Sequence, residues 1–146
     1  MKLRHLYSLL AIMVISLCQG CTSSEAWDSL PTSIADFITQ YYPGSNVTDY
    51  DKYDDDSYYV KINNGATLRF NSDLQWTEID GNGVTIPEVL AYDQFPPELF
   101  AFLQSTSQQR DIYGVKRDRK FYKLTMLDTV LTYDIQTGRI TYPGEN

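Results

Sequence analysis

Hydrophobic residues at helical spacing mark two segments of the chain, and each segment begins at proline. In the first, four apolar residues recur at i, i+3, i+4 and i+7: Ile34, Phe37, Ile38 and Tyr41. Pro31 suits the first turn of this helix, and Pro43-Gly44 ends it. The second segment follows Pro96-Pro97 and has a similar stripe: Leu99, Phe102 and Leu103. Both patterns predict amphipathic helices with one apolar face.

Alternation of apolar and polar residues follows each helix and predicts strands. The first set of apolar positions is Tyr58, Val60, Ile62, Leu68 and Phe70. Asn64-Gly65 lies between the two runs and is a strong hairpin turn signal. The second set is Tyr122, Leu124, Met126, Leu131 and Tyr133, with a turn near Asp128-Thr129. A short helix is also expected over 87–91, and one-sided alternation predicts an antiparallel sheet covered by helices on one face only.

The two sets of elements are related by an internal repeat. Matching residues lie 63 to 65 positions apart, as in Phe37 and Phe102, Tyr58 and Tyr122, and Leu68 and Leu131. The order of the matches is kept over the whole of both units, which span about 27–80 and 86–142. The sequence therefore predicts an α+β fold, in which a tandem repeat of helix plus antiparallel strands shares one sheet and leaves one face open.

The first twenty residues have the layout of a secretory signal. Met1–His5 is a short basic start, Leu6–Leu17 is a mainly apolar run, and Gly20 precedes Cys21. Twelve residues are too few to span a bilayer, which needs about twenty. We therefore expect residues 1–20 to be a signal peptide and residues 30–146 to form the domain. Removing Lys2 and Arg4 changes the formal net charge from −7 to −9.

Cys21 would be the first residue after cleavage. A cysteine at this position resembles the lipobox of bacterial lipoproteins, which implies a diacylglycerol on its thiol. Residues 21–29 would then be a short tether that holds the domain near the membrane, with the lipid as the only membrane contact. The alternative is an ordinary secretory cut near Gly20 that leaves a free cysteine.

The residues left after cleavage exclude several chemistries. His5 is the single histidine, and it leaves with the signal together with Cys18. Ser-His-Asp and Cys-His catalysis, histidine-bearing zinc sites and intramolecular disulfides are therefore excluded. We expect no enzyme activity and no cofactor, although a carboxylate-based hydrolase stays open as a third hypothesis. An acidic chain also argues against a nucleic-acid partner.

Two stretches of the chain closely resemble the PepSY-like family of bacterial envelope proteins. They are Leu-Pro-x-x-Ile-x-x-Phe-Ile at 30–38 and Tyr-Tyr-Val-Lys-Ile-Asn-Asn-Gly-Ala-Thr-Leu-Arg-Phe-Asn at 58–71. The resemblance covers about 27–142. It implies tandem units of helices on an antiparallel sheet, export or lipid anchoring, and a β-lactamase-inhibitor-like binding role. The chain departs from the family at Leu74, where a turn glycine is usual and where the second unit keeps Gly138.

Charge is divided unevenly along the exported part. Residues 21–94 have a net charge of −10, and residues 95–146 have a net charge of +1. The acidic cluster is Asp49, Asp51, Asp54, Asp55 and Asp56, which is either a calcium site or a solvated loop between two strands. The stretch 116–120 is its basic counterpart in the second unit. Together they form either mutually complementary loops or a two-poled surface that orients a partner.

The polar side of the predicted strands carries a mixture of aromatic and cationic residues. We expect the open face to be lined by Tyr59, Lys61, Arg69, Phe121, Lys123 and Thr125. This composition is typical of protein-recognition surfaces, although ordinary exposed strand residues would also fit. The sequence thus predicts an exported, lipid-anchored binding module for an envelope protein or peptide, as an inhibitor or regulator of a peptidase or other hydrolase. A ligand-responsive or calcium-responsive envelope protein is the alternative.

Overall fold

The computed structural model describes residues 22–145, which form four helices and eight strands. Two helices precede four strands in each half of the chain. The first half contains α1 (Thr22–Asp28), α2 (Thr32–Tyr41), β1 (Val47–Lys52), β2 (Tyr58–Ile62), β3 (Thr67–Phe70) and β4 (Trp76–Asp80). The second half contains α3 (Glu88–Gln94), α4 (Pro97–Ser105), β5 (Ile112–Arg117), β6 (Phe121–Met126), β7 (Val130–Asp134) and β8 (Ile140–Thr141).

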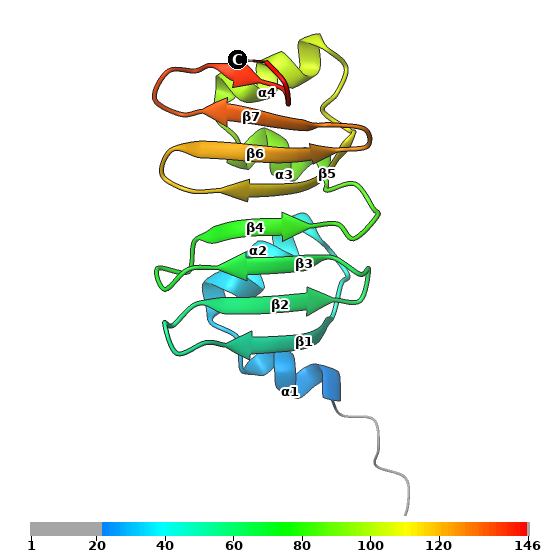
Figure 1. The fold of residues 1–146 in the computed structure, drawn as a ribbon. Helices are drawn as coiled ribbons and strands as arrows, with labels where there is room; N and C mark the ends of the chain where they lie inside the picture. Colours follow the sequence, from blue (N-terminus) through cyan, green and yellow to red (C-terminus); the bar gives the residue numbers. More distant parts are fainter. Residues whose placement is uncertain (1–21, 146) are drawn as a thin grey trace, which may run out of the picture.

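All eight strands belong to one open sheet whose order follows the chain, β1 to β8 (Figure 1). Every neighbouring pair is antiparallel. Helices α2, α3 and α4 lie behind the sheet in Figure 1, whereas α1 lies beside the edge strand β1. The predicted antiparallel open sheet with helices is confirmed. Among residues 22–145, no helix has both the length and the apolar character needed to cross a membrane.

The core lies between the sheet and the helices. Its most deeply buried members, with no exposed surface, come from both helices and strands: Ile34, Ile38, Val60, Leu68, Ile79, Leu90, Leu99, Leu103, Leu124 and Leu131. The helical stripe and the alternating strand positions predicted from the sequence therefore meet in one hydrophobic cluster. No buried charged residue is found among the described residues, so burial of apolar surface holds this core together.

The segment predicted as a tether differs from the expectation. Residues Thr22–Asp28 form helix α1, and the side chains of Ala26 and Trp27 pack against the core. Trp27 gains these apolar contacts only when the segment is folded against the domain. The segment is therefore helical, while its role as a tether stays a prediction. Cys21 and the predicted signal peptide 1–20 lie outside the described residues, so lipidation stays a prediction.

Two turns, one in each half, have a residue in the left-handed region: the fourth residue counted from Asn71 and the fifth counted from Asp134. Leu74 has φ of +60° in the β3–β4 turn, and Gly138 has φ of +70° in the β7–β8 turn. Both turns begin with a side-chain oxygen, of Asn71 or Asp134, that accepts backbone N–H groups inside the turn. The glycine position identified in the sequence is therefore a backbone requirement, and Leu74 occupies it with a strained conformation.

Substitutions at these turns should separate backbone strain from packing. A Cβ at Gly138 would meet no atom within 4 Å, so Gly138→Ala should destabilise by about 1 kcal/mol through φ alone. At Leu74, which packs against the core, Leu74→Gly should be about 1 kcal/mol more stable than Leu74→Ala, since both variants lose the same packing. Urea unfolding measures both differences, and equal stability of the two Leu74 variants would disprove the strain.

Adjacent tyrosines at the end of α2 differ in their hydrogen bonds. The Tyr41 hydroxyl accepts from Gln94 Nε2 at 2.8 Å and donates to Asp93 Oδ2 at 3.3 Å. The Tyr42 hydroxyl is buried and has no hydrogen-bond partner among the described residues. Burial raises the pKa of both side chains, most strongly that of Tyr42. An unpaired buried hydroxyl costs free energy that a phenylalanine would avoid.

Removing each hydroxyl should therefore have opposite effects. We expect Tyr41→Phe to lower the free energy of unfolding by about 1 kcal/mol, and Tyr42→Phe to leave it unchanged or raise it by up to about 1 kcal/mol. The raised Tyr42 pKa means that the folded state holds its proton more tightly, so this group costs stability as the pH rises above about 10. Tyr42→Phe should lessen that alkaline loss, and urea unfolding at pH 7 and pH 11 tests both effects. A larger loss at Tyr42 than at Tyr41 would contradict the assignment.

Candidate binding face

Among residues 22–145, no helix lies on one face of the sheet (Figure 1), and the side chains of this face alternate with the buried ones. All six residues predicted to line it lie on this open face: Tyr59, Lys61, Arg69, Phe121, Lys123 and Thr125. In β2, for example, exposed Lys61 lies between buried Val60 and buried Ile62. The alternation recognised in the sequence therefore identifies the face correctly, while the binding role of these residues stays a prediction.

Cross-strand register joins the open-face residues into a row that crosses the whole sheet. In strand order the row is Asp51, Tyr59, Arg69, Glu78, Lys116, Lys123, Thr132 and Thr141. A parallel row one pleat away contains Asp49, Lys61, Thr67, Asp80, Gly114, Thr125 and Val130. We call these the long row and the short row.

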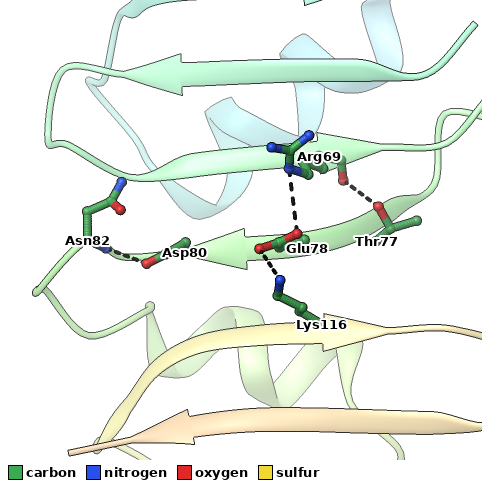
Figure 2. A network of polar contacts seen from close by, with 6 residues as sticks. All are labelled: Arg69, Thr77, Glu78, Asp80, Asn82 and Lys116. Atoms are coloured by element: carbon green, nitrogen blue, oxygen red, sulfur yellow. Dashed lines mark hydrogen bonds and ion pairs between the residues drawn. The ribbon is translucent and has the colours of Figure 1, made fainter. Parts of the chain in front are cut away.

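An ion-pair network lies at the centre of the long row, where the two halves of the sheet meet (Figure 2). Glu78 of β4 accepts Lys116 Nζ at 3.0 Å from β5 and Arg69 Nε at 3.5 Å from β3. The guanidinium of Arg69 also lies 5.1 Å from the centroid of the Tyr59 ring. Arg69 and Lys116 are half-exposed to exposed, so these pairs orient side chains more than they stabilise the fold.

Beyond this network the face carries cations without partners. Lys61 and Lys123 form no ion pair with any described residue. Lys123 lies directly opposite Lys116 in the β5–β6 register, and like charges opposite one another destabilise a sheet. Phe121 adds a ring that is 39% exposed. Exposed cations beside an aromatic ring give this face the means to bind a carboxylate-bearing surface.

A shallow depression of about 470 Å³ interrupts the open face at the β4–β5 junction. Gly114 forms its floor in the short row, with Asp80 and Thr125 as its cross-strand neighbours. A Cβ on Gly114 would lie 3.3 Å from the carbonyl oxygen of Ile79, which is tight against the backbone. Asp80 Oδ1 accepts the backbone N–H of Asn82 at 2.8 Å, so its carboxylate is held at the rim (Figure 2).

The acidic cluster is divided between a strand and a turn, which corrects the prediction of one loop. Asp49 and Asp51 belong to β1 and lie at the edge of the open face, because their strand pairs with β2. Asp54–Asp56 form the turn, in which Asp56 pairs with Lys52 at 2.7 Å. Hydrogen bonds from Ser57 lower the pKa of Asp55. Within residues 22–145, no three acidic, histidine or cysteine side chains converge on a possible metal position.

The basic stretch is also divided between the two faces. Lys116 lies on the open face, whereas Arg117 points to the covered side, with its Nε 2.7 Å from the Trp76 carbonyl and its Cζ 3.8 Å from the Trp76 ring centroid. Asp118 closes the following turn by accepting the backbone N–H groups of Lys120 and Phe121, and these bonds lower its pKa. Arg117 is therefore a packing residue and contributes nothing to a charged outer surface.

Three residues of the face were missed by sequence reasoning: Glu78, Asp80 and Gly114. They lie on β4 and β5, where β-bulges interrupt the alternation that identified the other strands. The register shifts between Arg69 and Phe70 against β4, and between Ile112 and Gly114 against β6. Only the opposite charges of Glu78 and Lys116 could have suggested a cross-strand pair, and that signal needs the register first.

An open antiparallel sheet with helices on one face and a charged, aromatic-bearing opposite face defines an α+β domain with a solvent-exposed sheet surface. The family described as "putative beta-lactamase-inhibitor-like, PepSY-like" matches residues 25–73 and 56–140. The chain therefore belongs to the PepSY-like family. A comparison with curated protein sequences found no match.

Solved structures with the same fold come from Bacteroides. A putative periplasmic protein from Bacteroides vulgatus superposes with a TM-score of 0.66 at 20% identity, over 79% of this chain and 90% of that one. A putative calcium-regulated periplasmic protein from Bacteroides thetaiotaomicron gives 0.64 at 21% identity, over 79% and 92%. A second periplasmic protein of unknown function from B. vulgatus gives 0.63 at 23%, over 78% and 93%. At these identities the likeness establishes the fold.

Proposed function

We propose that the protein is an exported, lipid-anchored binding module of the cell envelope, without enzyme activity, whose open sheet face contacts another envelope protein or a peptide. The observation that carries the proposal is the uncovered face itself, on which Lys61 and Lys123 have no ion partner among the described residues. The descriptions of the structural relatives as periplasmic support export. The inhibitor-like description of the family supports a role as inhibitor or regulator of a peptidase or other hydrolase.

We also propose that the binding face arises from two copies of one unit. Each half has two helices followed by four strands. The bulge between Val47 and Asp49 in β1 recurs between Ile112 and Gly114 in β5, at a separation of 65 residues. A shared irregularity is stronger support than shared regular elements, because bulges depend on particular local sequences.

The test is a capture experiment with an envelope extract. The wild-type protein is compared with a face variant that carries Tyr59→Ala, Lys61→Ala and Arg69→Ala. We expect the wild type to retain a distinct protein and the face variant to lose it, since aromatic rings and Arg contribute most of the energy at interfaces. Thermal unfolding of both proteins checks that the face variant is folded.

A matched control carries the same residue types away from the open face: Tyr92→Ala, Lys52→Ala and Arg110→Ala. Tyr92 is 67% exposed on α3, while Lys52 and Arg110 form exposed ion pairs with Asp56 and Glu88. This variant should capture as the wild type does. Equal capture by the face variant would show that the interface does not lie on the open face.

A further inference from the structure

The charges of the open face repeat with a pattern that is complementary to itself. Along the long and short rows, acids lie on β1 and β4, whereas the cations lie on β2 and β3 and then on β5 and β6. In a two-fold symmetric dimer, each contact occurs twice, so a self-complementary surface must place unlike groups on one another under a single rotation. For a two-fold axis parallel to the strands, the position of the axis across the sheet decides whether this condition is met.

An axis between β3 and β4 satisfies it. This rotation lays β1 over β6, β2 over β5 and β3 over β4 of the second copy, and keeps each row over itself. The long row then opposes Asp51 with Lys123, Tyr59 with Lys116, and Arg69 with Glu78. Each of these contacts is favourable, as an ion pair or as a cation over an aromatic ring.

Neighbouring positions of the axis fail. An axis along β3 would place Arg69 on Arg69, and one along β4 would place Glu78 on Glu78. An axis between β4 and β5, at the centre of the sheet, would place Arg69 over Lys123. An axis between β2 and β3 would place Asp51 over Glu78. Like charges brought together in an interface cost several kcal/mol, so the axis between β3 and β4 is favoured over these neighbouring positions.

The short row adds a matching of shape. In the same arrangement Lys61 of one copy lies over Gly114 of the other, which is the floor of the depression of about 470 Å³. Asp80 at the rim of that depression has no cation partner among the described residues, and neither does Lys61. The dimer would therefore give partners to four charged groups that each copy leaves unpaired: Asp51, Lys61, Asp80 and Lys123.

We propose that the open face binds a second copy of this chain in a face-to-face, two-fold dimer with its axis between β3 and β4. The inference rests on the proposed function, in which this face is an interface, and names one partner for it. The face offers fewer residues than the 20–30 per side of a standard interface, and they are mostly polar. The dimer should therefore be weak, dependent on protein concentration, and loosened by salt that screens its charges.

Charge exchange at Asp51 and Lys123 tests the arrangement by sedimentation equilibrium of the protein produced from the full chain, from about 10 μM to about 500 μM in low salt. We expect a monomer–dimer equilibrium for the wild type. Lys123→Asp and Asp51→Lys should each weaken it by about tenfold or more, because the symmetry repeats the repulsion. The double variant Asp51→Lys, Lys123→Asp should restore it.

Rescue can come only from contact between copies. Asp51 on β1 and Lys123 on β6 are five strand spacings apart in one sheet, about 24 Å, so they do not compensate each other within a monomer. A wild type that stays monomeric, a dimer unaffected by the single variants, or a double variant that is not restored would each overturn the proposal. If the wild type is monomeric but captures a different protein through the open face, the dimer is disproved and the proposed function is kept. Failure of the dimer can therefore be distinguished from failure of the proposed function.

Discussion

Trp76→Ala should destabilise the protein by about 3–5 kcal/mol and divide its unfolding into two steps. Trp76 is on β4, the last strand of the first half, yet its side chain contacts the second half. Its Nε1 donates to Gln94 Oε1 at 2.9 Å, and its ring meets Tyr122 edge-on at 6.1 Å. Arg117 covers the other part of the ring at 3.8 Å. Truncation removes all three contacts and leaves the Gln94 oxygen without this donor.

Besides the paired strands, a few polar side-chain contacts join the halves: Tyr41 with Gln94 and Asp93, and Glu78 with Lys116. The β4–β5 register comprises three residue pairs, compared with five in the β5–β6 register. Without Trp76 the sheet keeps these backbone pairs, but loses the side chain that packs across them. We therefore expect the first and second halves to unfold at different denaturant concentrations, because cooperativity depends on the contacts between them.

Far-UV circular dichroism and Trp27 fluorescence during urea unfolding measure this. Trp27 reports on the first half, since it packs against the core from α1. Leu124→Ala in the Trp76→Phe background is the control, because Trp27 is then the single tryptophan. Leu124 is fully buried in β6, so its truncation should cost a similar free energy while both signals stay coincident. In Trp76→Phe the two signals should still change together, and the free energy of unfolding should fall by about 1–2 kcal/mol. One coincident transition in Trp76→Ala would show that the halves stay coupled without Trp76, and would disprove the prediction.

Periodicity predicted the elements whose exposure follows a simple rule. The helix over residues 32–41 buries every third or fourth residue, and the β2–β3 and β6–β7 hairpins bury every second residue. The same spacings of apolar residues are visible in the sequence. The turn of β6–β7 begins one residue earlier than expected, because Met126 N–H donates to Thr129 O and leaves Leu127 and Asp128 as the loop. Local hydrogen bonds are enough to shift the start of a turn by one residue.

The remaining elements depend on contacts that no local pattern encodes. Strand β1 was read as a loop because five aspartates obscure its alternation, yet pairing with β2 holds Asp49 and Asp51 in extended backbone. Helix α1 exists through the contact of Trp27 with the core. The six predicted face residues were found by alternation, while Glu78 and Gly114 needed the register across the bulges. Tertiary contacts thus decided the parts that sequence reasoning missed.

Leu68→Ala and Leu131→Ala should each destabilise the protein by about 2.7–5 kcal/mol, the range for a fully buried leucine. The two residues lie 63 positions apart on the third strand of each half, β3 and β7, and neither has exposed surface. Leu68 pairs with Val60 on one side and Ile79 on the other. Leu131 pairs with Leu124, while β8 pairs only with Thr132 and Tyr133. We therefore expect Leu68→Ala to be the more costly of the two.

The double variant measures how strongly the two leucines are coupled within the one hydrophobic cluster. Strands β3 and β7 are four spacings apart, about 19 Å, so the two losses should add to within about 0.5 kcal/mol. Thr67→Ala and Thr132→Ala, at the adjacent open-face positions, are the matched controls and should each change stability by less than about 0.5 kcal/mol. Urea unfolding of the six proteins gives the comparison. A double loss well below the sum would mean that the first cavity already loosens the second leucine, and that the two ends of the cluster are coupled.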